Sequence, residues 1–172
     1  PTVTPTRTVT PTRPATPTAC PIQITSTVAG SVALTDPTFQ RPNTFSQGGS
    51  CSTSTTGAGV HYDAYEYTLA EATVVRASLC AAGGGSANFD SFVAIYQAPG
   101  GTRIDPFVPN GCALAIAAND DFCGSASQAQ ANLEAGYYYV VVTQYSTNNS
   151  LCTGGLCYGD YTLAIGEQDC PN

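Results

Sequence analysis

The chain has 172 residues and a formal net charge of −7, from twelve acidic residues and five arginines, with no lysine. Nucleic-acid binding needs clustered cationic contacts to phosphates, so this charge balance argues against a nucleic acid as partner. No apolar stretch approaches the about 20 residues of a membrane-spanning helix, and we expect no membrane span. Eight cysteines with one histidine favour four disulfides over a zinc site, which predicts an exported protein, extracellular or at the cell surface.

Residues 1–19 read as an extended arm or linker, and residues 20–172 as one folded domain. Thr2–Arg7 repeats as Thr8–Arg13, and such a Thr/Pro tract buries too little apolar surface to fold alone. Both an edge strand and a polyproline II helix remain open for it.

Threonine occupies every even position of the arm from 2 to 18 except Pro14. On a strand, these threonine amides would all point to one edge, while the prolines at 5 and 11 would remove donors from the other edge only. The arm carries a charge of +2 and the remainder −9, which favours docking on protein slightly. The residues that we expect to dock on a neighbouring copy are Val3, Pro5, Arg7, Val9, Pro11 and Arg13.

Covalent glycans are a further expectation for an exported chain of this composition. Asn148 begins an Asn-Asn-Ser sequon for N-glycosylation. The O-glycosylation candidates on the arm are Thr2, Thr4, Thr6, Thr8, Thr10, Thr12, Thr16 and Thr18.

From Cys20 onward the apolar pattern has a period of two, and clusters of Gly, Asn, Asp and Pro separate the runs. Ser125–Ala135 contains a weak helical alternative, within which we favour a strand. We predict an all-β fold, an antiparallel sandwich of about seven to nine strands. The predicted strands cover Ile22–Ile24, Val32–Leu34, Tyr62–Leu69, Thr73–Leu79, Phe92–Tyr96, Ala113–Ala117, Gln128–Leu133, Tyr138–Val142 and Tyr161–Ile165.

Six short motifs follow one another along this domain. They are YDAY at 62–65, SLC at 78–80, NFDS at 88–91, NDD at 119–121, EAGYY at 134–138 and GDYTL at 159–163. In this order and spacing, from about residue 24 to residue 165, the chain resembles the bacterial pre-peptidase C-terminal domain. The resemblance implies a compact β-sandwich of the kind that is appended to secreted hydrolases and other exported proteins. It implies no catalysis.

The cysteines are expected to staple the sandwich. A sandwich often brings its termini together, which favours a Cys20–Cys170 pair, and Cys152–Cys157 would close a short Gly-rich loop. The remaining Cys51, Cys80, Cys112 and Cys123 pair among themselves in one of three ways. The family resemblance suggests Cys80 with Cys123, because each adjoins one of the motifs.

Acidic residues offer the clearest candidates for a binding site. Asp120 and Asp121 are adjacent, and the resemblance places Asp90 near them. These residues suit turns, a calcium site built from carboxylate oxygens, or the carboxylate pair of a glycosidase. Because adjacent side chains on a strand diverge, we expect Asp120 and Asp121 to need a partner from elsewhere. Calcium is the one cofactor considered, with Asp90, Asp120 and Asp121 as ligands.

Nothing else in the chain forms a catalytic motif. His61 is the single histidine, no Gly-x-Ser-x-Gly elbow is present, and a phosphate-binding loop lacks its lysine. Tyr137–Tyr139 place at least one ring outward for glycan stacking, although alternation on a strand explains them equally well.

We therefore expect a non-catalytic structural protein, a subunit of an extracellular filament or surface assembly. Its arm would dock on a neighbouring copy and build a head-to-tail homopolymer. The alternative is an accessory domain of a secreted hydrolase, in which residues 1–19 are a linker and the domain binds calcium or glycan.

Overall fold

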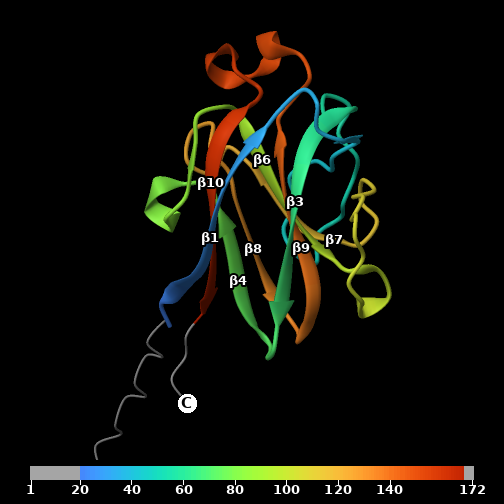
Figure 1. Ribbon diagram of the computed structural model, residues 1–172, viewed down its shortest axis with the longest axis vertical. Coiled ribbons are helices and arrows are strands. Elements are labelled where there is room, and N and C mark those ends of the chain that lie inside the picture. The colour runs from blue at the N-terminus through green and yellow to red at the C-terminus, as the bar shows by residue number, and fades with distance from the viewer. Residues whose placement is uncertain (1–19, 169–172) are drawn as a thin grey trace, which may run out of the picture.

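The computed structural model describes residues 20–168, so the arm at 1–19 and the last four residues lie outside the described part. The described residues form an antiparallel β-sandwich, as predicted (Figure 1). They contain ten strands, two of which, β2 and β5, are only two residues long and account for the excess over the predicted number. The strands are β1 (Ile22–Val32), β2 (Thr38–Phe39), β3 (Val60–Leu69), β4 (Thr73–Ser78), β5 (Ser86–Ala87), β6 (Ser91–Gln97), β7 (Ala115–Asp120), β8 (Gln128–Leu133), β9 (Gly136–Gln144) and β10 (Gly159–Gln168).

Two five-stranded sheets make up the sandwich. One sheet has the order β1-β10-β4-β8, with β5 paired to β10, and the other has the order β2-β3-β9-β6-β7. Every ladder is antiparallel. The edge strands β7 and β8 close one side of the sandwich, and β1 and β3 face each other at the opposite side (Figure 1).

The continuous apolar runs of β6 and β9 reflect burial on both faces of the second sheet. One face packs in the core between the sheets, through Val93, Ile95, Val140 and Val142. The other face lies under irregular segments, where a second cluster gathers rings and small residues. That cluster includes Phe39, Tyr62, Phe92, Tyr96, Phe107, Tyr139 and Val141. A strand that is covered on both faces needs apolar residues at consecutive positions. In β9, the three tyrosines and three valines of Tyr137–Val142 meet this requirement.

Three of the predicted strands differ from the structure. The predicted strands at 22–24 and 32–34 fall in one strand, β1, which ends at Val32, before Leu34. Its middle alternates exposed and half-buried positions that carry mostly small or polar residues, so it lacks an apolar signature. The strand predicted at 113–117 begins instead at Ala115 and runs to Asp120, because Asn110–Ala113 forms a tight bridge and Leu114 adopts a positive φ of 62°. By contrast, β8 occupies Gln128–Leu133 as predicted, and no helix forms there.

Three disulfides staple the described residues, and none of their cysteines is free. Cys80 pairs with Cys123 and Cys152 with Cys157, as expected, and the remaining pair is Cys51–Cys112. Cys170 lies outside the described residues, so its pairing with Cys20 stays a prediction. Three disulfides indicate an oxidising compartment.

The described helices are four three-residue 3-10 turns, η1 (Ala81–Gly83), η2 (Pro99–Gly101), η3 (Asn149–Leu151) and η4 (Thr153–Gly155). None of them has the length and apolarity of a membrane-spanning helix.

Candidate functional site

The three predicted ligands, Asp90, Asp120 and Asp121, come together at one end of the sandwich. Asp90 immediately precedes β6, and Asp120 is the last residue of β7. Because β6 and β7 pair antiparallel with Phe92 opposite Asp120, the start of one strand lies beside the end of the other. One carboxylate oxygen from each of the three residues lies within 4.8 Å of the other two.

Asp120 and Asp121 converge because the strand ends between them. Asp121 has a φ of +46°, in the left-handed region that Asp and Asn tolerate better than most residues. This conformation interrupts the alternation that would send the two carboxylates to opposite faces. The sequence-based expectation that they diverge is therefore wrong.

Asp90 is the buried member of the cluster, with only 3% of its surface exposed. Its Oδ2 accepts a hydrogen bond of 2.5 Å from the backbone amide of Thr153, which lies in η4. Its own amide donates to the carbonyl of Leu156 in the loop that the Cys152–Cys157 disulfide closes. Asp90 thus ties a distant loop to the sheet and is not a local turn residue.

Arg41 is a buried cation beside this cluster. The guanidinium lies over the rings of Phe92 and Tyr145, at 4.3 and 4.8 Å from the ring centroids to its central carbon. Its Nε donates to the Tyr145 carbonyl and its Nη1 to the Pro42 carbonyl, each at 2.9 Å. A Cβ built on Gly57 would stand 2.2 Å from Cγ of Arg41, so only glycine at position 57 admits this side chain.

The electrostatics of the cluster disfavour three ionised carboxylates. Burial, and then the charge of Asp121, raise the pKa of Asp120 to about 7, although Arg41 opposes the shift. Burial also raises the pKa of Asp90, while the hydrogen bond from Thr153 lowers it. Burial lowers the pKa of Arg41, and the charge of Asp120 opposes this shift.

The other sequence-predicted residues lie apart from the cluster. Asn148 is exposed, and its Oδ1 accepts hydrogen bonds from the backbone and hydroxyl of Ser150. His61 is half-buried in β3, with Nδ1 at 2.7 Å from the Asp36 carbonyl oxygen. Of the three consecutive tyrosines, Tyr137 is 40% exposed, while the next two are buried. The predicted arm residues lie outside the described part of the chain.

A second feature is the outer edge of β3. The Tyr62 amide donates to the Pro37 carbonyl at 3.1 Å, on the side away from β9. Since N–H groups alternate along a strand, those of Ala64, Glu66 and Thr68 point to the same outer edge. The register with β9 is continuous from Tyr62 to Leu69, and within residues 20–168 no backbone group pairs with these three outward positions.

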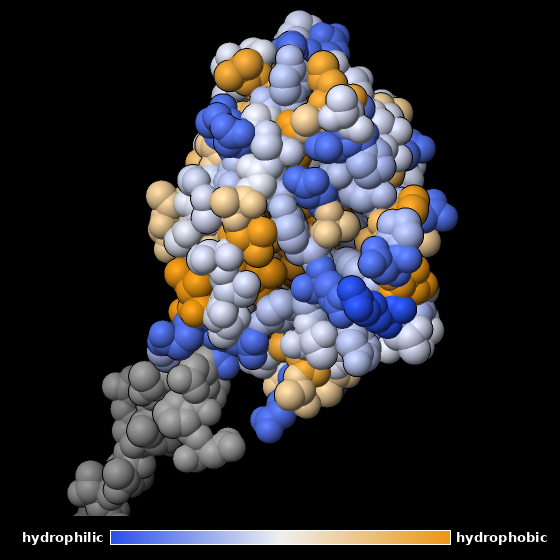
Figure 2. Space-filling model, viewed as in Figure 1, coloured by the Kyte–Doolittle hydropathy of each residue, from blue (hydrophilic) through white to orange (hydrophobic). Residues whose placement is uncertain are grey.

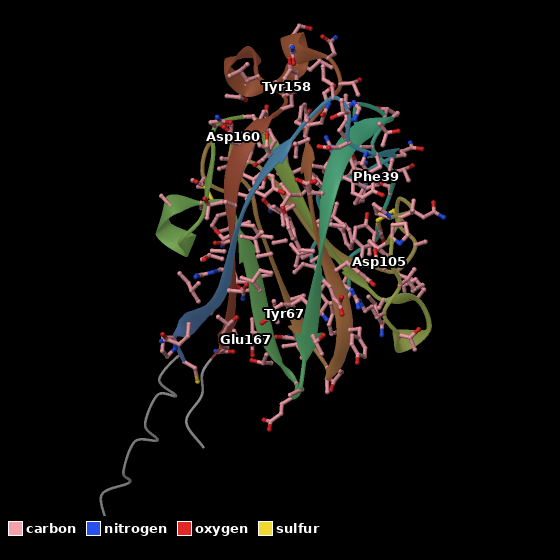
Figure 3. All side chains as sticks on the ribbon, in the orientation of Figure 1. Phe39, Tyr67, Asp105, Tyr158, Asp160 and Glu167 are labelled. Atoms are coloured by element: carbon pink, nitrogen blue, oxygen red, sulfur yellow. A yellow bond between two sulfur atoms is a disulfide. The ribbon has the colours of Figure 1, made fainter. Side chains whose placement is uncertain are left out.

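This edge borders a cleft and carries acidic groups. The cleft is lined on one side by β3 and on the other by the segment from Arg103 to Phe107. Arg103 Nε forms an ion pair of 2.6 Å with Glu66, and Asp63 and Asp105 also line the cleft. Figure 2 shows hydrophilic surface at the lower right of the molecule, and Figure 3 shows Asp105 to the right of β3.

On the face that points toward the other sheet, β3 is fixed to β10 by hydrogen bonds of tyrosine hydroxyls. Tyr67 donates to Glu167 of β10, and the two side chains point toward each other in Figure 3. The Tyr65 and Tyr161 hydroxyls lie 2.6 Å apart, and Tyr161 donates to Asp63. These side-chain hydrogen bonds therefore hold β3 in place without occupying the backbone groups of its outer edge.

Sequence reasoning missed both Arg41 and the β3 edge. Arg41 comes from the long irregular segment between β2 and β3, in which no periodic pattern marks a buried position. No protein-family model matches this chain, and a search of curated proteins found no match. The resemblance to the pre-peptidase C-terminal domain therefore stays a prediction.

Proposed function

We propose that this chain is an exported, non-catalytic structural subunit whose copies join by strand addition. In this proposal the arm, residues 1–19 of one copy, pairs with the outer edge of β3 in the next copy. The observation that carries the proposal is that the backbone groups of Ala64, Glu66 and Thr68 in β3 have no backbone partner within residues 20–168. An unpaired strand edge is a template for another chain, and main-chain hydrogen bonds then supply affinity.

The arm has the pattern that such an edge requires. With threonine at the even positions, the amides of Thr4, Thr6, Thr8 and Thr10 all point to one edge of an extended arm. Pro5 and Pro11 have the opposite parity, so their missing donors face away from β3. Every second residue of β3 presents both its N–H and its C=O outward, which matches this two-residue repeat.

Charge complementarity favours β3 over β1, the other edge on this side of the sandwich. The arm carries Arg7 and Arg13 and no acidic residue. Around the β3 edge lie Asp63, Glu66 and Asp105, and Arg103 is the one basic residue among the described residues that line the cleft. The sequence of β1, Ile22–Val32, contains no acidic residue at all.

A head-to-tail contact that does not close into a ring generates a filament, and we infer such an open arrangement for the docking of one arm on the next domain. The threonine side chains of the docked arm would lie on one face, which would expose their hydroxyls to solvent for O-linked glycosylation. Asn148 is exposed for N-linked glycosylation. We infer that the assembly lies outside the cell or at its surface, and the oxidising compartment that the disulfides indicate supports this inference.

A proline at position 66 tests the docking edge without removing a bond of the β9 ladder, because the Glu66 amide points outward. We expect Glu66→Pro to abolish filaments in electron micrographs, as deletion of residues 1–18 should. Glu66→Gln is the matched control, since it loses the same ion pair with Arg103 but keeps the amide. Filaments that persist unchanged in Glu66→Pro, or after the deletion, overturn the proposal.

The alternative of an accessory domain with a linker predicts a different result. The full chain would then be a monomer by light scattering at all concentrations, and neither variant would change its mass. Such an outcome overturns the structural proposal and favours the accessory domain.

A further inference from the structure

The acidic end of the sandwich contains buried oxygen atoms that lack partners. Oδ1 of Asp90 and Oδ1 of Asp120 are shielded from solvent and accept no hydrogen bond within the described residues. Asp90 as a whole is 97% buried, which follows from its 3% exposure. A buried carboxylate oxygen without a partner costs more than the average hydrogen bond contributes, so such atoms need a specific explanation.

Arg41 does not satisfy these oxygens. Two of its N–H groups are directed to backbone carbonyls, and its flat faces cover Phe92 and Tyr145. The ion pairs formed within residues 20–168 both involve Arg103, so Arg41 comes no closer than 4 Å to a carboxylate there. Three carboxylates beside one guanidinium leave a local charge of −2 when all are ionised, which equals the charge that one divalent cation neutralises.

We propose that Asp90, Asp120 and Asp121 bind one Ca²⁺ ion. The donors are all oxygen, which is the ligand type of hard cations, and no histidine or free thiol is present among them to favour a transition metal. Calcium–oxygen distances are about 2.3–2.6 Å, so two ligands on opposite sides of the ion lie about 5 Å apart. Carboxylate oxygens within 4.8 Å of one another therefore fit around a single ion.

The graded burial of the three ligands suits entry of the ion from solvent. Asp121 is exposed, Asp120 is half-buried and Asp90 is buried. An incoming ion meets Asp121 first and replaces its remaining waters with the two inner carboxylates and further water or carbonyl oxygens. Calcium accepts such irregular shells, whereas magnesium holds its waters in a strict octahedron.

The ion would connect three segments that are distant in sequence. Asp90 holds the 149–157 loop through Thr153 and Leu156. Asp121 opens the β7–β8 turn, which the Cys80–Cys123 disulfide fixes to the end of β4. Calcium binding therefore stabilises the folded state, with the affinity typical of extracellular modules, a Kd of about 10⁻⁴–10⁻³ M.

Calorimetric titration of CaCl₂ into the chelator-treated full chain tests this site, together with thermal unfolding. We expect one ion per chain, and a rise in Tm of about 3–6 °C when calcium is tenfold above Kd. Asp121→Asn should weaken binding at least about tenfold, and this variant keeps the fold because asparagine also tolerates a positive φ. Asp160→Asn, an exposed acid outside the cluster, should bind as the unmodified chain does.

Asp90→Asn tests the buried ligand separately. The asparagine oxygen still accepts the hydrogen bond from the Thr153 amide, so the variant removes the charge and keeps this contact. It too should lose calcium binding. The proposal is overturned by unchanged affinity in both variants, or by no heat and no Tm shift at about 10⁻² M CaCl₂, which is tenfold above the upper Kd of about 10⁻³ M. An equal Tm rise with MgCl₂ at the same ionic strength also overturns it.

Discussion

The Cys80–Cys123 disulfide should contribute more to stability than the Cys152–Cys157 disulfide, because it closes a longer loop. The two pairs span 43 and 5 residues. In the chain-entropy treatment, a loop of the first size restricts the unfolded chain by about 4 kcal/mol and one of the second size by about 2 kcal/mol. The double variant Cys80→Ala/Cys123→Ala should therefore lose about 2 kcal/mol more than Cys152→Ala/Cys157→Ala.

Denaturant unfolding under non-reducing conditions measures both losses as a free energy of unfolding. A chelator should be present throughout, so that calcium linkage does not add to either value. The m-values should rise in both variants, since each unfolded chain becomes more expanded. Equal losses, or a smaller loss for the Cys80 pair, would refute the argument from loop length.

Three further outcomes follow from buried polar groups. Burial raises the pKa of Asp63, so its ionisation opposes folding. Its contribution to stability is greatest while it is protonated, below the unfolded pKa, and is lost as pH rises through the folded pKa. Asp63→Asn, which still accepts from Tyr161, should raise Tm at pH 7 and lose this advantage below about pH 4; a constant gain at both pH values would contradict this. Gly57→Ala should destabilise by about 1–3 kcal/mol through the clash with Arg41, measured by thermal unfolding. Tyr67→Phe should cost about 1 kcal/mol by losing its bond to Glu167, and an unchanged Tm would rule this out.

The strands could be predicted because their side-chain pattern is local. Gln128–Leu133 alternates buried and exposed residues, and the pattern alone sets its limits. The displaced start of β7 could not be predicted, because the turn before it is fixed by a disulfide from Cys112 to Cys51, 61 residues away. A local window contains no signal for such a constraint.

The sequence predicted which residues form the acidic cluster, but it did not predict how their carboxylates are arranged. Asp90 and Asp120 meet because β6 and β7 are neighbours in the sheet, a matter of topology that the family resemblance suggested. The convergence of Asp120 and Asp121 depends on one positive φ at Asp121. The position of Arg41 depends on Gly57 and on the rings of Phe92 in β6 and Tyr145 just after β9, so it is defined only once the fold is complete.

Docking of the arm on the β3 edge predicts an alternating pattern of amide protection along β3. In isolated subunits, the amides of Ala64, Glu66 and Thr68 face outward, whereas those of Tyr65 and Tyr67 pair with β9. Amide exchange followed by NMR in the arm-deleted chain should therefore be fast at positions 64, 66 and 68 and slow at 65 and 67. Adding a peptide with the sequence of residues 1–19 should slow the three even positions and leave the odd ones unchanged, because only the even amides gain partners. Protection of all five positions alike would mean that the peptide covers the face of β3 and does not extend its sheet.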